Sequence, residues 1–135
     1  MTTLATLQSL IAQGESETLE LKRSTAALKR AGETHCAFLN GEGGKVLIGV
    51  GPDGKLVGQD VADITPRDIA VMLGRFEPPA RVEMSRVDVE NGRQVIVLEA
   101  VPSRQFAPFV FESKPYKRVG STTTVMSQEA SAPRA

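Results

Sequence analysis

A short apolar run, KVLIGV at Lys45–Val50, constrains the fold more than any other part of this sequence. Six residues are fewer than a typical helix needs, and an apolar run without alternation is typical of a strand buried on both faces. The turn-forming residues Gly51-Pro52-Asp53-Gly54 follow directly. We therefore expect a central buried strand and then a tight turn, from which Lys55–Gly58 pairs back as a hairpin.

Alternation between apolar and polar residues predicts further strands. It runs over Thr18–Arg23, Arg81–Val89 and Gln94–Val101. Asn91-Gly92 separates the last two segments and is the strongest short hairpin signal in the chain, because both residues readily adopt the left-handed backbone of a tight turn. A last extended stretch runs from Phe109 through Val119, before Gly120-Ser121.

Apolar residues at helical spacing predict three helices. They cover Thr2–Gln13, Ala26–Asn40 and a segment from Thr65 to about Phe76. Gly14 should end the first helix, and Asn40-Gly41 should end the second as a left-handed cap. Thr65 is expected to be the N-cap of the third helix, with Pro66 at its first helical position and Pro78-Pro79 beyond its end.

The interleaved helices and strands, with two hairpins among them, predict an α+β fold. We expect a two-layer sandwich, in which a mixed sheet of about five or six strands is packed by about three helices. A length of 135 residues with 41% apolar composition suits one domain with its own core. The expected organisation is an N-terminal helix over 1–13, a domain over 14–126 and a flexible C-terminal tail over 127–135.

Composition and charge exclude several classes of protein. The chain holds 16 basic and 16 acidic residues, which argues against a disordered chain or a strongly basic DNA-coating protein. Cys36 is the single cysteine, so no internal disulfide can form, and no stretch approaches 18 consecutive apolar residues. We therefore expect a soluble cytoplasmic protein without a membrane partner. Residues 21–45 and 102–135 each carry a net charge of +3, and these two segments either form one patch facing a polyanion or scatter over a solvated surface.

Acidic residues cluster just before the first predicted strand, at Glu15, Glu17 and Glu20. On an extended backbone Glu15 and Glu17 share a face, whereas a turn or bulge there would bring Glu15 and Glu20 together. Converging carboxylates hold Mg²⁺ or Mn²⁺, and Asp53 or Asp60 would supply a third ligand of a nuclease-like site. On spacing alone, three solvated glutamates are the stronger interpretation.

The segment NGEGGK at Asn40–Lys45 is similar in composition to a phosphate-binding loop. Such a loop needs a strand before it and a helix after it, so that backbone N–H groups face the phosphate. Here the expected order is helix, glycines and strand, and Val46 stands where Ser or Thr would bind magnesium. The sequence therefore argues against an ATP site, and the glycines are better explained as a helix end.

Four segments together, in this order and spacing, carry a resemblance to a known family. They are Gly14–Arg23 (GESETLELKR), Cys36–Val50 (CAFLNGEGGKVLIGV), Asp53–Gly58 (DGKLVG) and Pro115–Ser121 (PYKRVGS). They resemble the Schlafen AlbA_2 domain, formerly labelled a divergent AAA-type ATP-binding domain, over about Gly14 to Thr124. The resemblance implies a DNA-binding or transcriptional-regulator domain, since family members are described in those terms.

The resemblance also implies a second activity. Some vertebrate Schlafens, which carry related lobes, cleave transfer and ribosomal RNA with three carboxylates. Two of these would map to Glu15 and Glu20, and the third falls just after the I-G-V motif. This sequence departs from the family there, because Gly51 and Pro52 occupy those positions and Asp53 follows one or two places later.

From these observations we expect a nucleic-acid-binding module, with a regulatory role, whose basic residues contact the phosphates of tRNA-like RNA or duplex DNA. The expected contacts are Lys22, Arg23, Lys45, Lys117 and Arg118. An alternative is a metal-dependent endoribonuclease, in which Glu15, Glu20 and Asp53 bind Mg²⁺ or Mn²⁺ as the catalytic and metal site. A further alternative is a protein-interaction domain.

A homodimer is expected because the resemblance implies a groove between two lobes, and this chain offers one. Phe106, Phe109 and Phe111 crowd one extended segment beside the basic run Lys114–Arg118, which suits an interface rimmed by charge. The alternative is that these rings close the core of the chain itself.

Overall fold

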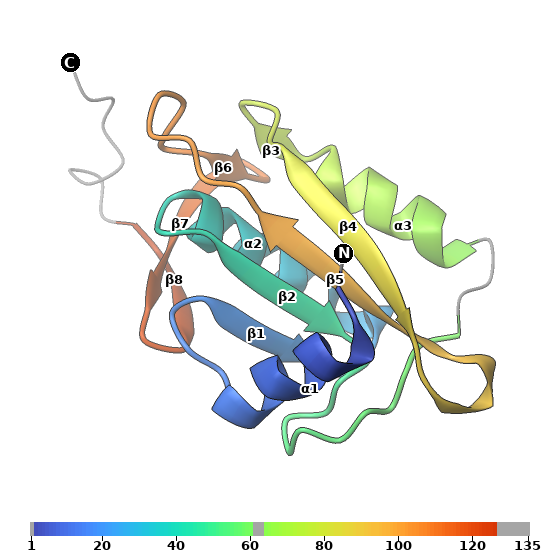
Figure 1. Ribbon diagram of the computed structural model, residues 1–135. Helices are drawn as coiled ribbons and strands as arrows, with labels where there is room; N and C mark the ends of the chain where they lie inside the picture. The colour runs from blue at the N-terminus through green and yellow to red at the C-terminus, as the bar shows by residue number, and fades with distance from the viewer. Residues whose placement is uncertain (1, 61–63, 127–135) are drawn as a thin grey trace.

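The computed structural model describes residues 2–60 and 64–126, and a four-stranded sheet holds their centre. Its strands are β1 (Leu19–Lys22), β2 (Gly44–Ile48), β4 (Val82–Asp88) and β5 (Gln94–Ala100). The spatial order is β1-β2-β5-β4, with β1 parallel to β2 and the other pairs antiparallel (Figure 1). The apolar run is therefore a central strand, as predicted, and β4 and β5 form the hairpin that Asn91-Gly92 indicated.

Helices cover both faces of this sheet (Figure 1). They are α1 (Leu4–Gln13), α2 (Leu28–Leu39) and α3 (Ile64–Leu73). Successive strand residues point to opposite faces. Leu47 of β2 packs in one apolar cluster with Leu7 of α1, whereas Val46 and Ile48 pack in a second cluster with residues of α2 and α3. Burial on both faces explains why this strand is apolar throughout.

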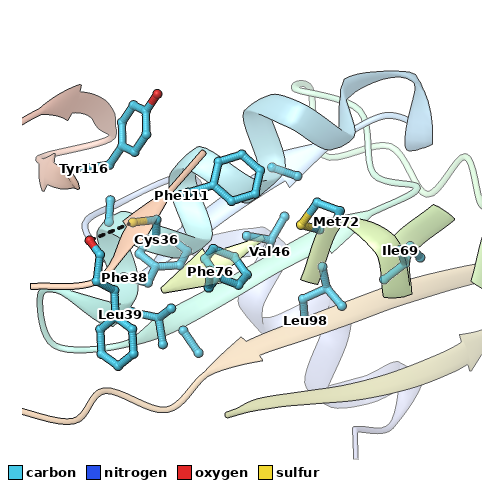
Figure 2. Packing of buried hydrophobic residues seen from close by; sticks show 14 of the residues in the cluster. Cys36, Phe38, Leu39, Val46, Ile69, Met72, Phe76, Leu98, Phe111 and Tyr116 are labelled. Atoms are coloured by element: carbon cyan, nitrogen blue, oxygen red, sulfur yellow. Dashed lines mark hydrogen bonds between the residues drawn. The ribbon is translucent and has the colours of Figure 1, made fainter. Parts of the chain in front are cut away.

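A second four-stranded sheet packs against the other side of α2. It contains β3 (Phe76–Glu77), β6 (Val110–Phe111), β7 (Lys114–Val119) and β8 (Thr122–Val125), in the order β3-β6-β7-β8. The Phe111 ring lies so close to α2 that a Cβ at Gly32 would stand 2.4 Å from it. Figure 2 shows Phe111 beside Phe76 in the buried cluster; their ring centroids are 5.1 Å apart.

The α+β class is confirmed, but the predicted single mixed sheet is two sheets, with α2 between them rather than in a simple two-layer sandwich. The expected stretch from Phe109 to Val119 is in fact two strands, because Glu112 (φ 49°) and Ser113 (φ 73°) turn the chain back. Neither residue is a Gly, Pro or Asn, so the usual turn signal is missing from the sequence.

Asn40, just after α2, ties this helix to the second sheet. Its Oδ1 accepts the Phe109 N–H at 2.6 Å, and its Nδ2 donates to the carbonyls of Phe109 and Tyr116, both at 2.9 Å. The expected left-handed cap at Asn40-Gly41 is wrong, because Asn40 keeps a right-handed backbone (φ −85°). Gly43 is left-handed instead (φ 86°), and its N–H bonds to the Phe38 carbonyl.

For the other two helices, only some of the predicted ends agree with the structure. Gly14 (φ 77°) ends α1 as predicted. The N-cap expected at Thr65 is wrong, since α3 already includes Ile64, and Pro66 lies inside the first turn, where a missing N–H is tolerated. The helix also ends earlier than expected, at Leu73, because Phe76 belongs to β3.

The phenylalanines do not form the exposed apolar interface that the predicted homodimer requires. Phe109 is 2% and Phe111 0% exposed, so these rings fill the core of the chain itself, whereas Phe106 is exposed. The homodimer therefore stays a prediction, and the apolar patch proposed for its interface is buried in the core. None of the helices in the described residues is long and apolar enough to cross a membrane. The predicted tail over 127–135 lies outside the described residues.

Candidate functional site

Glu20 of β1 is buried against the second sheet rather than solvated. Because Leu19 and Leu21 face α1, Glu20 and Lys22 point to the opposite side. The Glu20 side chain is 11% exposed; its Oε1 lies 3.2 Å from Lys22 Nζ and its Oε2 accepts a hydrogen bond from Arg118 Nη2 at 3.0 Å. Both carboxylate oxygens therefore have a cationic partner.

Arg118 of β7 connects the two sheets. Its side chain is 4% exposed. Nε donates to the Ser16 carbonyl and Nη2 to the Leu19 carbonyl, each at 3.0 Å, while Nη1 donates to Thr123 Oγ1 at 3.0 Å. The guanidinium also lies 5.3 Å from the centre of the Phe38 ring. These contacts engage all three guanidinium nitrogens within the fold, although the side chain also lines a small pocket beside Lys117.

Glu15 and Glu20 are brought together by the tight turn before β1, in which Ser16 pairs with Leu19. Glu15 Oε2 accepts the Leu21 N–H at 3.0 Å, and its carboxyl is hydrogen-bonded to that of Glu20. Burial, and then this hydrogen bond, raise the pKa of Glu15. Burial alone would raise the pKa of Glu20, but the hydrogen bonds from Glu15 and Arg118 outweigh it and lower that pKa. Of the two carboxylates, Glu15 is therefore the one that binds a proton first as the pH falls.

Asp53 does not complete a metal site with these glutamates. It lies in the turn after β2, where its Oδ1 accepts the Lys55 N–H at 3.1 Å. Within residues 2–60 and 64–126, no three His, Cys, Asp or Glu side chains are grouped to hold a metal ion. Since both Glu20 oxygens already contact cations, the residues present do not fit Mg²⁺ or Mn²⁺.

Two other predicted phosphate contacts have acidic neighbours. Lys45 stands opposite Glu99 in the sheet, and Glu99 stands opposite Glu83, so one cation shares its row with two carboxylates. Lys117 lines a small pocket of about 160 Å³ together with Glu17 and Glu42. These neighbours weaken the positive potential at both lysines. Lys22 is likewise held by Glu20.

Arg23, the remaining predicted contact, belongs to a pocket that gathers cationic side chains. We call it the basic pocket; it measures about 330 Å³ and is lined by Arg23, Lys55, Leu56, Val57, Val89, Glu90, Asn91 and Arg93. Arg23 and Lys55 are exposed and form no salt bridge with another described residue. Three cations thus face one carboxylate in the lining.

The strand directions assemble this pocket at one edge of the first sheet. Arg23 follows β1, and Lys55 follows the turn after β2, which runs parallel to β1. Arg93 stands just before β5, which is antiparallel to β2 and therefore begins at the same edge. Sequence reasoning missed Lys55 and Arg93, although each lies beside a strong turn signal that places it at a strand end.

Arg93 is oriented by its surroundings. Its Nη1 donates to the Val57 carbonyl at 3.4 Å, and its Nη2 lies 3.6 Å from Asp60 Oδ2. Its aliphatic stem packs on Gly58, where an added Cβ would stand 2.6 Å from the Arg93 Cβ. The basic pocket therefore has one positioned guanidinium, while Arg23 and Lys55 add two exposed cations.

Comparison with known proteins places this geometry among relatives. The family sequence profile described as Schlafen, AlbA_2 matches residues 15–127. The N-terminal domain of a RecG-related protein from Nitrosomonas europaea, described in relation to ATP-dependent DNA helicases, superposes with a TM-score of 0.65 at 24% identity, covering 90% of this chain and 92% of that one. The DIP2311 protein from Corynebacterium diphtheriae superposes with a TM-score of 0.60 at 17% identity, over 91% of this chain and 29% of that one. No curated protein sequence matches this chain. These identities show a shared fold.

Proposed function

The chain belongs to the Schlafen AlbA_2 family, and we propose that it is a nucleic-acid-binding module that contacts phosphates through the basic pocket. The observation that carries this proposal is the gathering of Arg23, Lys55 and Arg93 around one pocket. The structural neighbour from Nitrosomonas europaea is described as related to a DNA helicase, which supports a nucleic-acid ligand. Binding of this kind suits a regulatory domain.

The chemistry of the pocket favours phosphate. Arginine offers a planar fork of donors that matches phosphate oxygens, and lysine adds a point charge. Arg23 and Lys55 are not neutralised by a carboxylate among the described residues. Each phosphate that such cations neutralise releases condensed counterions, so the logarithm of affinity falls with the logarithm of salt by roughly 0.9 per contact on duplex DNA. Contacts of this kind read backbone shape rather than base sequence.

Filter binding with tRNA and duplex DNA, at low and moderate salt, tests the proposal. The full chain should bind at low salt and weaken as salt rises. The double variant Arg23→Ala/Lys55→Ala should bind at least about tenfold more weakly with a shallower salt dependence. Lys114→Ala/Lys117→Ala is the matched control, because it removes two exposed cations from outside the basic pocket. Equal binding by Arg23→Ala/Lys55→Ala and the wild type, or no binding at low salt, would overturn the proposal.

Two alternative activities and the homodimer can be measured alongside. Chelator-sensitive cleavage of tRNA in the presence of Mn²⁺, lost in Glu20→Gln, would reveal a metal-dependent endoribonuclease. Absence of any nucleic-acid binding would leave a protein-interaction domain as the remaining candidate. Light scattering at tens of micromolar reports the mass of the assembly, and a homodimer would bring two basic pockets into one particle.

A further inference from the structure

The lining of the basic pocket combines cationic and aliphatic side chains. Besides its cations, it presents three partly buried aliphatic side chains. These are Leu56, Val57 and Val89. A phosphate on the outside of a duplex offers charge and hydrogen-bond acceptors but no apolar surface, so it would leave the exposed parts of these aliphatic side chains without a contact in the ligand.

From this combination, and resting on the proposed function, we infer that the basic pocket takes one unpaired nucleotide. The sugar and base lie against Leu56, Val57 and Val89, and the phosphate contacts the cations Arg23, Lys55 and Arg93. The module then prefers single-stranded segments, overhangs or loops over continuous duplex, in which every base is stacked inside the helix.

The size of the pocket fits this ligand. A volume of about 330 Å³ lies at the lower end of the range for small-ligand sites, roughly 300–1,000 Å³. One nucleotide is a ligand of this class, whereas a paired helix can only lie across the rim. Aliphatic surface covers a base face without the rigid stacking that an aromatic ring would add, so we expect modest affinity for each nucleotide.

Asn91 provides the polar group that a base edge needs. It lines the pocket at the tip of the β4–β5 hairpin, and its side-chain amide makes no hydrogen bond to another described residue. An amide offers both a donor and an acceptor, so it can pair with the Watson–Crick edge of an unstacked base. Its backbone is left-handed (φ 62°), which glycine adopts without cost. Asn91→Gly therefore removes the amide and keeps the turn.

Fluorescence anisotropy of the full chain at low salt tests the inference. The ligands are a labelled single strand of mixed sequence, the same sequence as a blunt duplex, and that duplex with a three-nucleotide overhang. The single strand and the overhang should bind at least about fivefold tighter than the blunt duplex. An unlabelled nucleoside monophosphate should displace the single strand at a concentration where inorganic phosphate does not.

Variants separate the two halves of the pocket. Asn91→Gly and Val89→Ser should reduce single-strand binding by about threefold or more and leave duplex binding unchanged, with Lys117→Ala as the control. Thermal melting of each variant checks that it folds. Equal binding of single strand and blunt duplex, both lost in Arg23→Ala/Lys55→Ala, would overturn the nucleotide pocket while the proposed function stands. Absence of binding to all three ligands would overturn both.

Discussion

Arg118 Nη2 and Glu20 Oε2 lie 3.0 Å apart, although the two residues are 98 positions apart in the chain. The contact joins β7 of the second sheet to β1 at the edge of the first. Both side chains are largely buried. Each charge has lost most of its hydration, and its attraction to the opposite charge offsets that loss. Glu20 and Arg118, which look like surface charges in the sequence, therefore form a buried ion pair that holds the two sheets together.

Removing this buried ion pair should destabilise the fold. Arg118→Ala leaves Glu20 with one cation and strips three backbone or hydroxyl acceptors of their donor, so we expect a loss of about 3 kcal/mol in the free energy of unfolding. Glu20→Gln keeps an acceptor and should cost less. Urea denaturation measures both. Lys117→Ala, exposed on the same strand, serves as the control, and an Arg118→Ala value matching it would contradict the role assigned here.

Asn40 should tolerate neither truncation nor a carboxylate. Asn40→Ala leaves the Phe109 N–H without its acceptor and removes the amide donor from the Phe109 and Tyr116 carbonyls, of which that of Phe109 keeps only the weak Cys36 thiol donor. We expect a cost of about 2–3 kcal/mol. Asn40→Asp keeps the acceptor for the N–H but places a negative charge against both carbonyls, so it should be at least as destabilising. Chemical denaturation compares the two variants. An Asn40→Asp protein as stable as the wild type would show that the amide donor is dispensable.

Gly32 should resist replacement even though alanine favours a helix. Alanine gains about 1 kcal/mol of helix propensity, but its Cβ would stand 2.4 Å from the Phe111 ring, and overpacking of a core costs about 1–3 kcal/mol. We expect a net loss and a lower melting temperature. Gly74→Ala, just after α3, is the control for a methyl group added in open space, since its nearest neighbour would be the Val71 carbonyl at 3.5 Å. Equal melting temperatures for the two variants would show that the Phe111 ring moves aside without cost.

His35 should make the fold sensitive to mild acid. It is 0% exposed, its two ring nitrogens have no hydrogen-bond partner, and burial lowers its pKa to about 4. The unfolded chain binds the proton first, near pH 6.5, so stability is complete above that pH and falls as the pH drops toward 4, by up to about 3 kcal/mol.

Urea denaturation at several pH values between 7 and 4.5 measures this loss. His35→Leu removes the titrating group from an apolar site beside Phe76, so the difference in stability between wild type and variant should shift in the variant's favour as the pH falls. Because carboxylates titrate in both proteins, only that difference reports on His35. A difference that stays constant over this range would mean that the buried imidazole finds a partner when protonated.

Local sequence signals predicted much of the first sheet. Most of the run at Lys45–Val50 became the central strand, which ends at Ile48, and Asn91-Gly92 lies in the hairpin turn. These signals act over a few residues through backbone preference and side-chain alternation, so they survive without tertiary context. The turn at Glu112-Ser113 has no such signal in the sequence. Phe111 and Tyr116, on either side of this turn, pack on α2, and this tertiary packing holds the turn in place.

The sequence by itself determined the α+β class, the strand that forms the centre and the family motifs. Only the tertiary structure decided which cations face a ligand. Arg23, Lys45 and Arg118 are equivalent charges in the sequence, yet they differ in the structure. Arg23 lines the basic pocket, Lys45 shares a row of the sheet with two glutamates, and Arg118 is buried between the sheets. A side chain's charge is local, but its exposure and its partners depend on strand direction and register, which join residues tens of positions apart.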